Sequence, residues 1–409
     1  MMTIATFPKI SLADTATANT NVIEDGEQEI SLAENYSLHI NNQSSSTYQF
    51  VLEGKTILNE DISFARVEAV QDIQSGSEHY VLVQERAEDS GAYLTFRLFH
   101  LTPDSVKEVF KSDKPYSKAD LTVDGDQIKV TYPVFADNKP RTEPTAIKAD
   151  IYQLTNGKLT LMSTVQGTDP QDKENSFKIK GTYQNPSWKE ISDYLTQAAQ
   201  AHNIPPEIVK AIAYQESAWR QFTTSGDPVI GFDGRGLGIM QITLAQSYLD
   251  SHPGLEDDLK YDWKKNIDYG VDILDEKWGY GGKANLTPTI NDNDKSNLVN
   301  WYFAIMAYNG FSKINDPNLS AYTPYQDLIY SHMKQYGLID VPKVENSDLN
   351  VYYVSGSSRM YFNNKMNYTI NSVIKSKYGF TNGEELQIDG SNISVRADAD
   401  VKANIIKVL

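Results

Sequence analysis

A single glutamate ends an otherwise apolar helical run in the middle of the chain. In and just before the stretch "IAYQESAWRQF", Glu216 follows Ile208 and Ile212 at intervals of four residues, and residues spaced in this way share one face of a helix. Burial of a carboxylate is unfavourable unless a partner or a reaction requires it. Burial raises the pKa of a carboxyl group, and so does the negative end of a helix. Glu216 is therefore a candidate general acid, and the alternative is a surface glutamate or one that caps a neighbouring group.

Two further stretches carry residues that suit a ligand cleft. The stretch Gly234–Thr243, "GRGLGIMQIT", has three glycines within five residues, and glycine lets the backbone approach a ligand closely. The stretch Phe303–Gly310, "FAIMAYNG", ends an apolar run with a tyrosine and an asparagine. Taken singly, each has a simpler explanation: a flexible loop in the first case and a helix C-cap in the second.

Together the three stretches resemble a known enzyme family. Glu216-Ser217, Gly238–Ile242 and Ala307–Gly310 are similar to the ES, GLMQ and AYN-G motifs of the SLT-type lytic transglycosylases. That family has the goose-type-lysozyme-like fold. The sequence departs from the motifs in one position, where GIMQ replaces GLMQ. The resemblance covers about residues 187–338 and does not extend to the rest of the chain.

The resemblance implies a role for each matching residue. Glu216 is expected to protonate the glycosidic oxygen between N-acetylmuramic acid and N-acetylglucosamine in peptidoglycan. The residues expected to contact the glycan strand are Ser217, Met240, Gln241, Tyr308 and Asn309. A lytic transglycosylase needs no second carboxylate, because the C6 hydroxyl of the substrate attacks and gives a 1,6-anhydro product.

The loop before the glycine-rich stretch leaves two alternatives open. Asp233 resembles, offset by one residue, an aspartate of the goose-type lysozymes, and a hydrolase needs a second carboxylate. The first alternative is therefore a muramidase in which Asp233 positions water. Asp-Gly also favours turns, which explains Asp233 without chemistry. The second alternative is a non-catalytic cell-wall-binding protein whose lysozyme-like domain is inert.

Helical periodicity supplies the elements that position these residues. Ser187 and Glu190 form a capping box that opens a first helix. A second helix opens at Pro205-Pro206. Three more are expected over Lys264–Trp278, Ser296–Tyr308 and Tyr325–Tyr336, the last of which ends at Gly337. Residues 187–338 are therefore predicted to form an all-α, lysozyme-like domain.

The flanking regions differ in pattern, so the predicted fold is multidomain. Residues 30–166 are predicted to form an antiparallel β domain, a meander or a sandwich, with hairpin turns at Asp124-Gly125 and Asn156-Gly157. Residues 167–186 are a polar linker. Residues 342–409 are expected to form a small α+β module with a helix over Asn371–Tyr378. A partner in the wall, or a protein partner, is expected through the β domain or this module.

Composition limits the classes of partner. The chain of 409 residues has a net charge of −17, which argues against nucleic acids and against anionic membrane surfaces. It has no cysteine, so disulfides and thiolate metal sites are excluded. No cofactor or metal is expected, because the loop "NDNDK" at Asn291–Lys295 lacks the glycine and glutamate of an EF-hand and is interpreted as a solvated loop.

The sequence also suggests where the protein acts. The apolar stretch Leu298–Tyr308 is too short to span a bilayer. Residues 1–29 are interpreted as a truncated signal segment or a disordered tail, because Ala16-Thr17-Ala18 resembles a signal-peptidase site. The expected protein is a secreted bacterial enzyme of the cell wall, with peptidoglycan glycan strands as its substrate.

Overall fold

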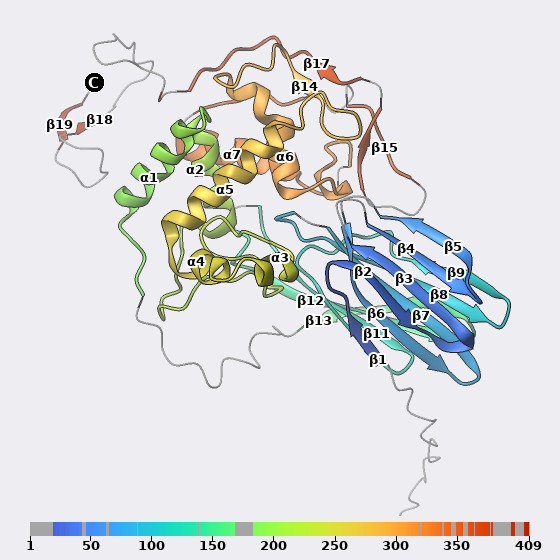
Figure 1. Ribbon diagram of the computed structural model, residues 1–409. Coiled ribbons are helices and arrows are strands. Elements are labelled where there is room, and N and C mark those ends of the chain that lie inside the picture. Colours follow the sequence, from blue (N-terminus) through green and yellow to red (C-terminus); the bar gives the residue numbers. More distant parts are fainter. Residues whose placement is uncertain are drawn as a thin grey trace, which may run out of the picture. The chain divides into compact units, whose positions relative to one another are not determined.

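The chain divides into two compact units in the computed structural model (Figure 1). The first unit comprises Met1–Glu88, Tyr93–Tyr132 and Ile147–Thr168, and the second comprises Asp89–Ala92, Pro133–Ala146 and Asp169–Leu409. Two short segments that interrupt the first unit in sequence therefore belong to the second. The structure describes residues 19–42, 46–62, 65–87, 89–137, 139–167, 183–319, 321–337, 339–344, 349–354, 359–363, 365–376, 378, 394–396 and 405–408.

The first unit consists of three sheets built from antiparallel pairs (Figure 1). The five-stranded sheet has the order β1 (Asn19–Val22), β6 (Ala65–Ser75), β7 (Glu78–Ala87), β8 (Leu94–Thr102) and β9 (Ser105–Lys111). The first four-stranded sheet contains β2 (Gly26–Ser31), β3 (Tyr36–Asn42), β4 (Thr47–Leu52) and β5 (Lys55–Asp61). The second contains β10 (Asp120–Asp124), β11 (Gln127–Val134), β12 (Ala146–Thr155) and β13 (Lys158–Gln166). The prediction of an antiparallel β region is confirmed.

The five-stranded sheet is buried on both faces. Along β7, Tyr80 and Leu82 belong to one core cluster, which includes residues of β10 to β13. Val81 and Val83 belong to another, which includes residues of β3 and β4. Because successive side chains of a strand point to opposite faces, this arrangement requires the continuous apolar run that β7 has.

The two predicted hairpin turns are formed. Asp124 pairs with Gln127 across the first, and Thr155 pairs with Lys158 across the second. Asn156 has φ of 51° and Gly157 has φ of 74°. A type I′ turn requires positive φ at both central residues, which asparagine and glycine adopt most readily.

The second unit contains the helices. They are α1 (Trp188–Ala201), α2 (Pro206–Ser217), α3 (Gln246–Ser251), α4 (Leu255–Tyr261), α5 (Trp263–Trp278), α6 (Tyr302–Asn309) and α7 (Tyr325–Gly337), with 3-10 turns η4 (Leu298–Trp301) and η5 (Lys313–Asn315). The predicted capping box opens α1: the backbone N–H of Glu190 donates to Ser187 Oγ at 3.2 Å, and Ser187 N–H donates to Glu190 Oε2 at 2.9 Å. The helix expected over Ser296–Tyr308 is η4 followed by α6, and the short helices α3 and α4 were not predicted.

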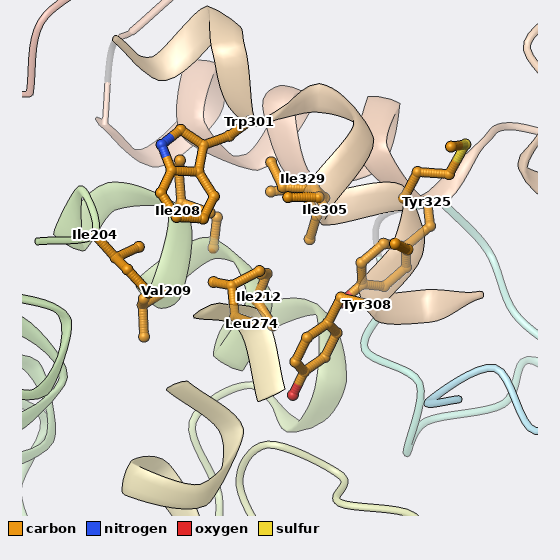
Figure 2. Packing of buried hydrophobic residues seen from close by; sticks show 14 of the residues in the cluster. Ile204, Ile208, Val209, Ile212, Leu274, Trp301, Ile305, Tyr308, Tyr325 and Ile329 are labelled. Atoms are coloured by element: carbon orange, nitrogen blue, oxygen red, sulfur yellow. The ribbon is translucent and has the colours of Figure 1, made fainter. Parts of the chain in front are cut away.

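One apolar core holds these helices together (Figure 2). Ile212 of α2, Leu274 of α5, Ile305 of α6 and Ile329 of α7 are all fully buried within it. Every residue of α6 is buried, which explains why its sequence is apolar nearly all round.

Some described residues of the C-terminal region belong to the same core. Met360, Phe362 and Tyr368 are buried in it. The short strands form three pairs. β14 (Thr289–Ile290) pairs in parallel with β17 (Asn367–Tyr368). β15 (Val351–Tyr352) pairs antiparallel with β16 (Tyr361–Phe362), and β18 (Ser394–Arg396) pairs antiparallel with β19 (Ile405–Val408).

The helix expected over Asn371–Tyr378 is wrong for the residues described there. Lys375 forms a β-bridge with Asn297 instead. The backbone N–H of Leu298 also donates to the carbonyl of Ile374 at 2.9 Å. Pairing with the segment that precedes η4 therefore outweighs the local helical pattern.

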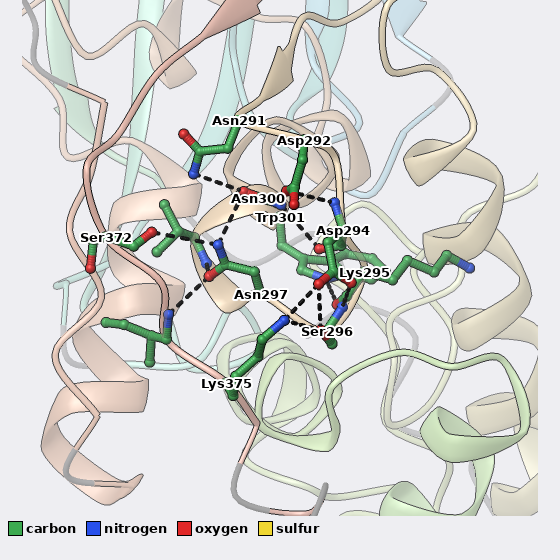
Figure 3. Close-up of polar contacts among 12 residues, drawn as sticks. Asn291, Asp292, Asp294, Lys295, Ser296, Asn297, Asn300, Trp301, Ser372 and Lys375 are labelled. Atoms are coloured by element: carbon green, nitrogen blue, oxygen red, sulfur yellow. Dashed lines mark hydrogen bonds and ion pairs between the residues drawn. The ribbon is translucent and has the colours of Figure 1, made fainter.

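The loop Asn291–Lys295 is part of this attachment (Figure 3). Asn300 Nδ2 donates to Asp292 Oδ1 at 3.1 Å, and Lys375 Nζ donates to Asp294 Oδ2 at 2.6 Å. This bond to the Lys375 ammonium group is the main cause that lowers the pKa of Asp294 to about 2. The acidic side chains thus serve contacts within the protein.

In the part of the chain that the structure describes, no helix is both long enough and apolar enough to cross a membrane. The segment Ala16-Thr17-Ala18 lies outside the described residues, as does most of the linker predicted over residues 167–186.

His332 is a buried histidine that stays neutral. Only 5% of it is exposed, and its ring packs against those of Tyr214 and Tyr336. Its Nε2 lies 2.5 Å from Gln215 Oε1, and because that oxygen can only accept, Nε2 carries the hydrogen. Burial lowers the pKa of His332 to about 4.

We expect this histidine to make folding pH-dependent. The pKa is depressed in the folded state, so below the unfolded value of about 6.5 the unfolded chain binds a proton that the folded chain does not. The free energy of unfolding should therefore fall between about pH 6.5 and about pH 4, by up to roughly 3 kcal/mol. His332→Gln should remove that part of the pH dependence. Urea titrations followed by tryptophan fluorescence measure it, because all five tryptophans lie in the second unit. The exposed His252→Gln is the control, and equal pH dependence in the two variants would contradict the expectation.

Candidate active site

Glu216 lies in the last turn of α2 and is fully buried, with 0% of its surface exposed. Ile208 and Ile212, on the same helix face, are equally buried. The helix ends directly afterwards, because Ala218 adopts a left-handed conformation with φ of 54°. The periodicity of the sequence therefore predicted the burial of this carboxyl group correctly.

Two hydroxyl groups donate to the same oxygen of Glu216. Tyr325 Oη, at the start of α7, lies 2.7 Å from Glu216 Oε1, and Ser90 Oγ lies 3.4 Å from it. Burial raises the pKa of Tyr325 and of Tyr308 well above the usual value, and the charge of Glu216 raises both further. Both phenols therefore stay protonated and remain donors. Figure 2 shows the two tyrosines next to each other at one edge of the core.

Ser217 fastens the end of α2 to the glycine-rich loop. Its Oγ donates to the carbonyl of Ile239 at 2.7 Å and accepts from the backbone N–H of Arg220 at 3.1 Å. The residue after the candidate acid thus determines where the loop lies relative to the helix.

Two buried amide side chains hold the glycine-rich loop. Gln221 Oε1 accepts from the backbone N–H of Ile239, and Asn266 Oδ1 accepts from that of Met240, both at 2.9 Å. Gly238 has φ of 68°, and a Cβ there would lie 2.4 Å from Asn266 Nδ2 and 2.5 Å from Gln221 Oε1. Glycine is required at this position because protein side chains, not a ligand, approach its backbone.

Met240 and Gln241 face the protein interior. Both are fully buried, and Gln241 Nε2 donates to the carbonyl of Gly238 at 2.9 Å. Met240 packs against α5, where a Cβ on Gly270 would lie 2.7 Å from its side chain. The carbonyl of Met240 accepts from Tyr308 Oη at 3.1 Å, so the loop is joined to α6 as well as to α2.

Asn315 connects the end of α6 to the start of α7. Its Nδ2 donates to Asn309 Oδ1 at 3.1 Å and to the carbonyl of Gly310 at 2.8 Å. Its Oδ1 accepts from the backbone N–H of Tyr325 at 3.1 Å. This amide therefore positions the tyrosine that donates to Glu216.

The segment Asp89–Ala92 completes the surroundings of Glu216 within the second unit. The backbone N–H of Ser90 donates to the carbonyl of Tyr308 at 3.3 Å, and that of Gly91 donates to the carbonyl of Asn309 at 3.1 Å. Asn309 Nδ2 donates to Ser90 Oγ at 3.3 Å.

Residues 193–328 match the family model for the transglycosylase SLT domain. The second unit contains an SLT domain. No match is found among the curated proteins or among the solved structures. All three sequence motifs lie within the matched residues, and the SLT domain supports a lysozyme-like, peptidoglycan-cleaving function.

Asp233 lies within a turn of the SLT domain. Gly234 N–H donates to the carbonyl of Gly231 at 2.9 Å, and Asp233 Oδ1 accepts from the backbone N–H of Arg235 at 3.2 Å. Among the described residues, no hydrogen bond joins Asp233 to Glu216. These contacts are those of a turn residue.

The SLT domain brings most of the expected residues together, along with others that the sequence did not indicate. Ser217 follows Glu216 in α2, and Ser90 connects Glu216 with Tyr308 and Asn309. Tyr308 bonds in turn to the carbonyl of Met240, and Gln241 bonds to the carbonyl of Gly238 in the same loop. Tyr325, Ser90 and Asn315 were missed. Their contacts to this group come from distant parts of the chain, and no local pattern indicates such contacts.

We expect Gly238→Ala to destabilise the SLT domain strongly. The new methyl group would overlap two buried amides in addition to the strain of a positive φ, so the loss should be about 3 kcal/mol or more. Gly234→Ala is the matched control, since φ is 76° there but no atom lies within 4 Å. That control should cost about 1–2 kcal/mol. Urea unfolding of both variants measures the difference, and equal losses would show that the amide clamp is unimportant.

Proposed function

We propose that the second unit cleaves the β-1,4 bond between N-acetylmuramic acid and N-acetylglucosamine of peptidoglycan, with Glu216 as the general acid and a 1,6-anhydro product. The observation that carries this proposal is the position of Glu216. It lies in the last turn of α2 within an SLT domain, and Tyr325 Oη donates to its Oε1 at 2.7 Å. Because this substrate is a wall polymer, we also propose that the protein acts after export.

The hydrogen bond from Tyr325 suggests how the acid works. Since Oε1 of Glu216 accepts from Tyr325 Oη, the proton of the carboxylic acid is carried on Oε2. Glu216 gives this proton to the glycosidic oxygen as the bond to C1 of the muramic acid breaks. The C6 hydroxyl of the same sugar then bonds to C1 and returns its proton to the carboxylate.

The neighbours of Glu216 are proposed to bind the glycan. We place Tyr308 and Asn309 beside the muramic acid, because Asn309 and Glu216 both bond to Ser90 Oγ. Met240 and Gln241 support this wall of the site, and Ser217 holds the loop that carries them.

Glu216→Gln tests the acid. The amide keeps the shape of the side chain but cannot donate the proton, and general acid catalysis contributes about 100- to 10,000-fold. The rate at which purified peptidoglycan is solubilised should fall at least that far, while the tryptophan fluorescence stays native. Glu207→Gln is the control, since Glu207 is also a buried glutamate of α2 and should retain activity. An active Glu216→Gln protein would refute the assignment.

Asp233→Asn tests the proposed product. A hydrolase that depends on this carboxylate should lose several orders of magnitude in rate, whereas a transglycosylase should stay within about tenfold of the wild type, or roughly 1.4 kcal/mol. We expect tolerance, together with 1,6-anhydro ends in mass spectra of the digested wall. Reducing ends combined with a nearly inactive, folded variant would establish a muramidase instead.

A further inference from the structure

The carboxyl group of Glu216 is inaccessible to solvent in this structure. A general acid must come within about 3 Å of the oxygen that it protonates, yet 0% of Glu216 is exposed. A glycan strand therefore cannot reach the acid unless a neighbouring group moves away.

The segment Asp89–Ala92 bonds to groups that the proposed function assigns to the substrate. Ser90 Oγ donates to Glu216 Oε1 and accepts from Asn309 Nδ2. These are the carboxyl and amide groups that the proposed function assigns to the sugar. Ser90 is 8% exposed and Ala92 is fully buried, so the segment is packed into the unit and does not lie loosely over it.

Backbone N–H groups of the segment Asp89–Ala92 donate to carbonyls at the end of α6. Ser90 and Gly91 donate to two successive carbonyls, those of Tyr308 and Asn309. Carbonyls in the last turn of a helix have no partner within the helix and are open to such donors. Asp89 also packs against Gly310: a Cβ on that glycine would lie 1.9 Å from Asp89 Oδ2.

The segment has its own internal turn, which gives it a defined shape. Asp89 Oδ1 and the carbonyl of Asp89 both accept from the backbone N–H of Ala92, each at 3.0 Å. A preformed turn loses little conformational freedom when it docks.

We propose that Asp89–Ala92 is an autoinhibitory plug, which covers the carboxyl group of Glu216 and occupies the amide of Asn309. The proposal rests on the proposed function for its biological meaning, but the occlusion itself is a property of the fold. The contacts described here are hydrogen bonds, each of which changes an equilibrium constant by a factor of a few to about ten. The plug is thus reversible, and a glycan strand must displace it to reach Glu216 and Asn309.

Accessibility of position 216 tests the plug without peptidoglycan. The chain has no cysteine, so Glu216→Cys in the full-length protein introduces a single thiol. Its reaction with a maleimide should be much slower in the folded protein than in urea. In this background the bond from Ser90 to the carboxyl group is already absent. Adding Ser90→Ala removes the remaining side-chain hydrogen bond, the one that Asn309 Nδ2 donates, and should speed the reaction by about threefold to tenfold. Gly91→Pro, which removes one backbone donor, should also speed it.

A matched serine controls for loss of stability. Ser112 is 2% exposed and accepts from the backbone N–H of Phe96 at 2.9 Å, so Ser112→Ala removes a buried hydroxyl in the first unit. This change should leave the labelling rate of the Glu216→Cys thiol within about twofold. If the folded thiol reacts as fast as in urea, or if neither Ser90→Ala nor Gly91→Pro speeds labelling in a folded protein, the plug is refuted.

The rate of wall solubilisation distinguishes a plug from a segment that positions Glu216. In the wild-type background, Ser90→Ala also removes the bond to Glu216, so it should raise the initial rate of wall solubilisation by at least the factor by which it raises labelling. A lower rate would make Ser90 a positioning residue for Glu216 and overturn the plug. If labelling responds but no variant solubilises walls, the proposed function fails while the occlusion stands. If Glu216→Gln abolishes wall solubilisation but neither Ser90→Ala nor Gly91→Pro changes the labelling rate, the plug alone fails.

Discussion

The hydrogen bond from Tyr325 to Glu216 joins the first turn of α7 to the last turn of α2 inside the core. A carboxyl group with no exposed surface needs donors close by, because it has lost the hydrogen bonds of water. The arrangement around it follows from this need. α7 must begin beside the end of α2, and Asn315 fixes that beginning by accepting from the backbone N–H of Tyr325. Tyr308 adds a second neutral phenol nearby.

Buried amides hold the loops of the site. Gln221, Asn266 and Asn315 each bond to the backbone of a loop or a helix end through both the oxygen and the nitrogen of the side chain. Fully satisfied buried networks of this kind specify one geometry, because any other arrangement would leave polar groups without partners. The glycine-rich loop therefore has a defined shape, and Gly238 is the position where the amides come closest.

The second unit draws on segments well outside the SLT match. Residues Pro133–Ala146 contact the end of α2: Arg141 N–H donates to the carbonyl of Gln215 at 2.8 Å, and Glu143 pairs with Arg220 at 2.6 Å. Described residues near the C-terminus complete the apolar core through Met360 and Tyr368. The second unit is thus larger than the motif-bearing residues, and the candidate acid Glu216 is also in contact with parts of the chain that carry no motif.

The sequence by itself determined what depends on neighbours along the chain. Helical spacing and the capping box at Ser187 located the helices, Asn156-Gly157 located a turn, and three local motifs indicated the family of residues 193–328. Only the tertiary structure decided which groups surround Glu216. Ser90 and Tyr325 lie more than one hundred residues from it in sequence, and contacts over such separations arise from packing, which leaves no periodic pattern. The same cause made the helix expected over Asn371–Tyr378 wrong, because pairing of Lys375 with Asn297 replaced a weak local preference.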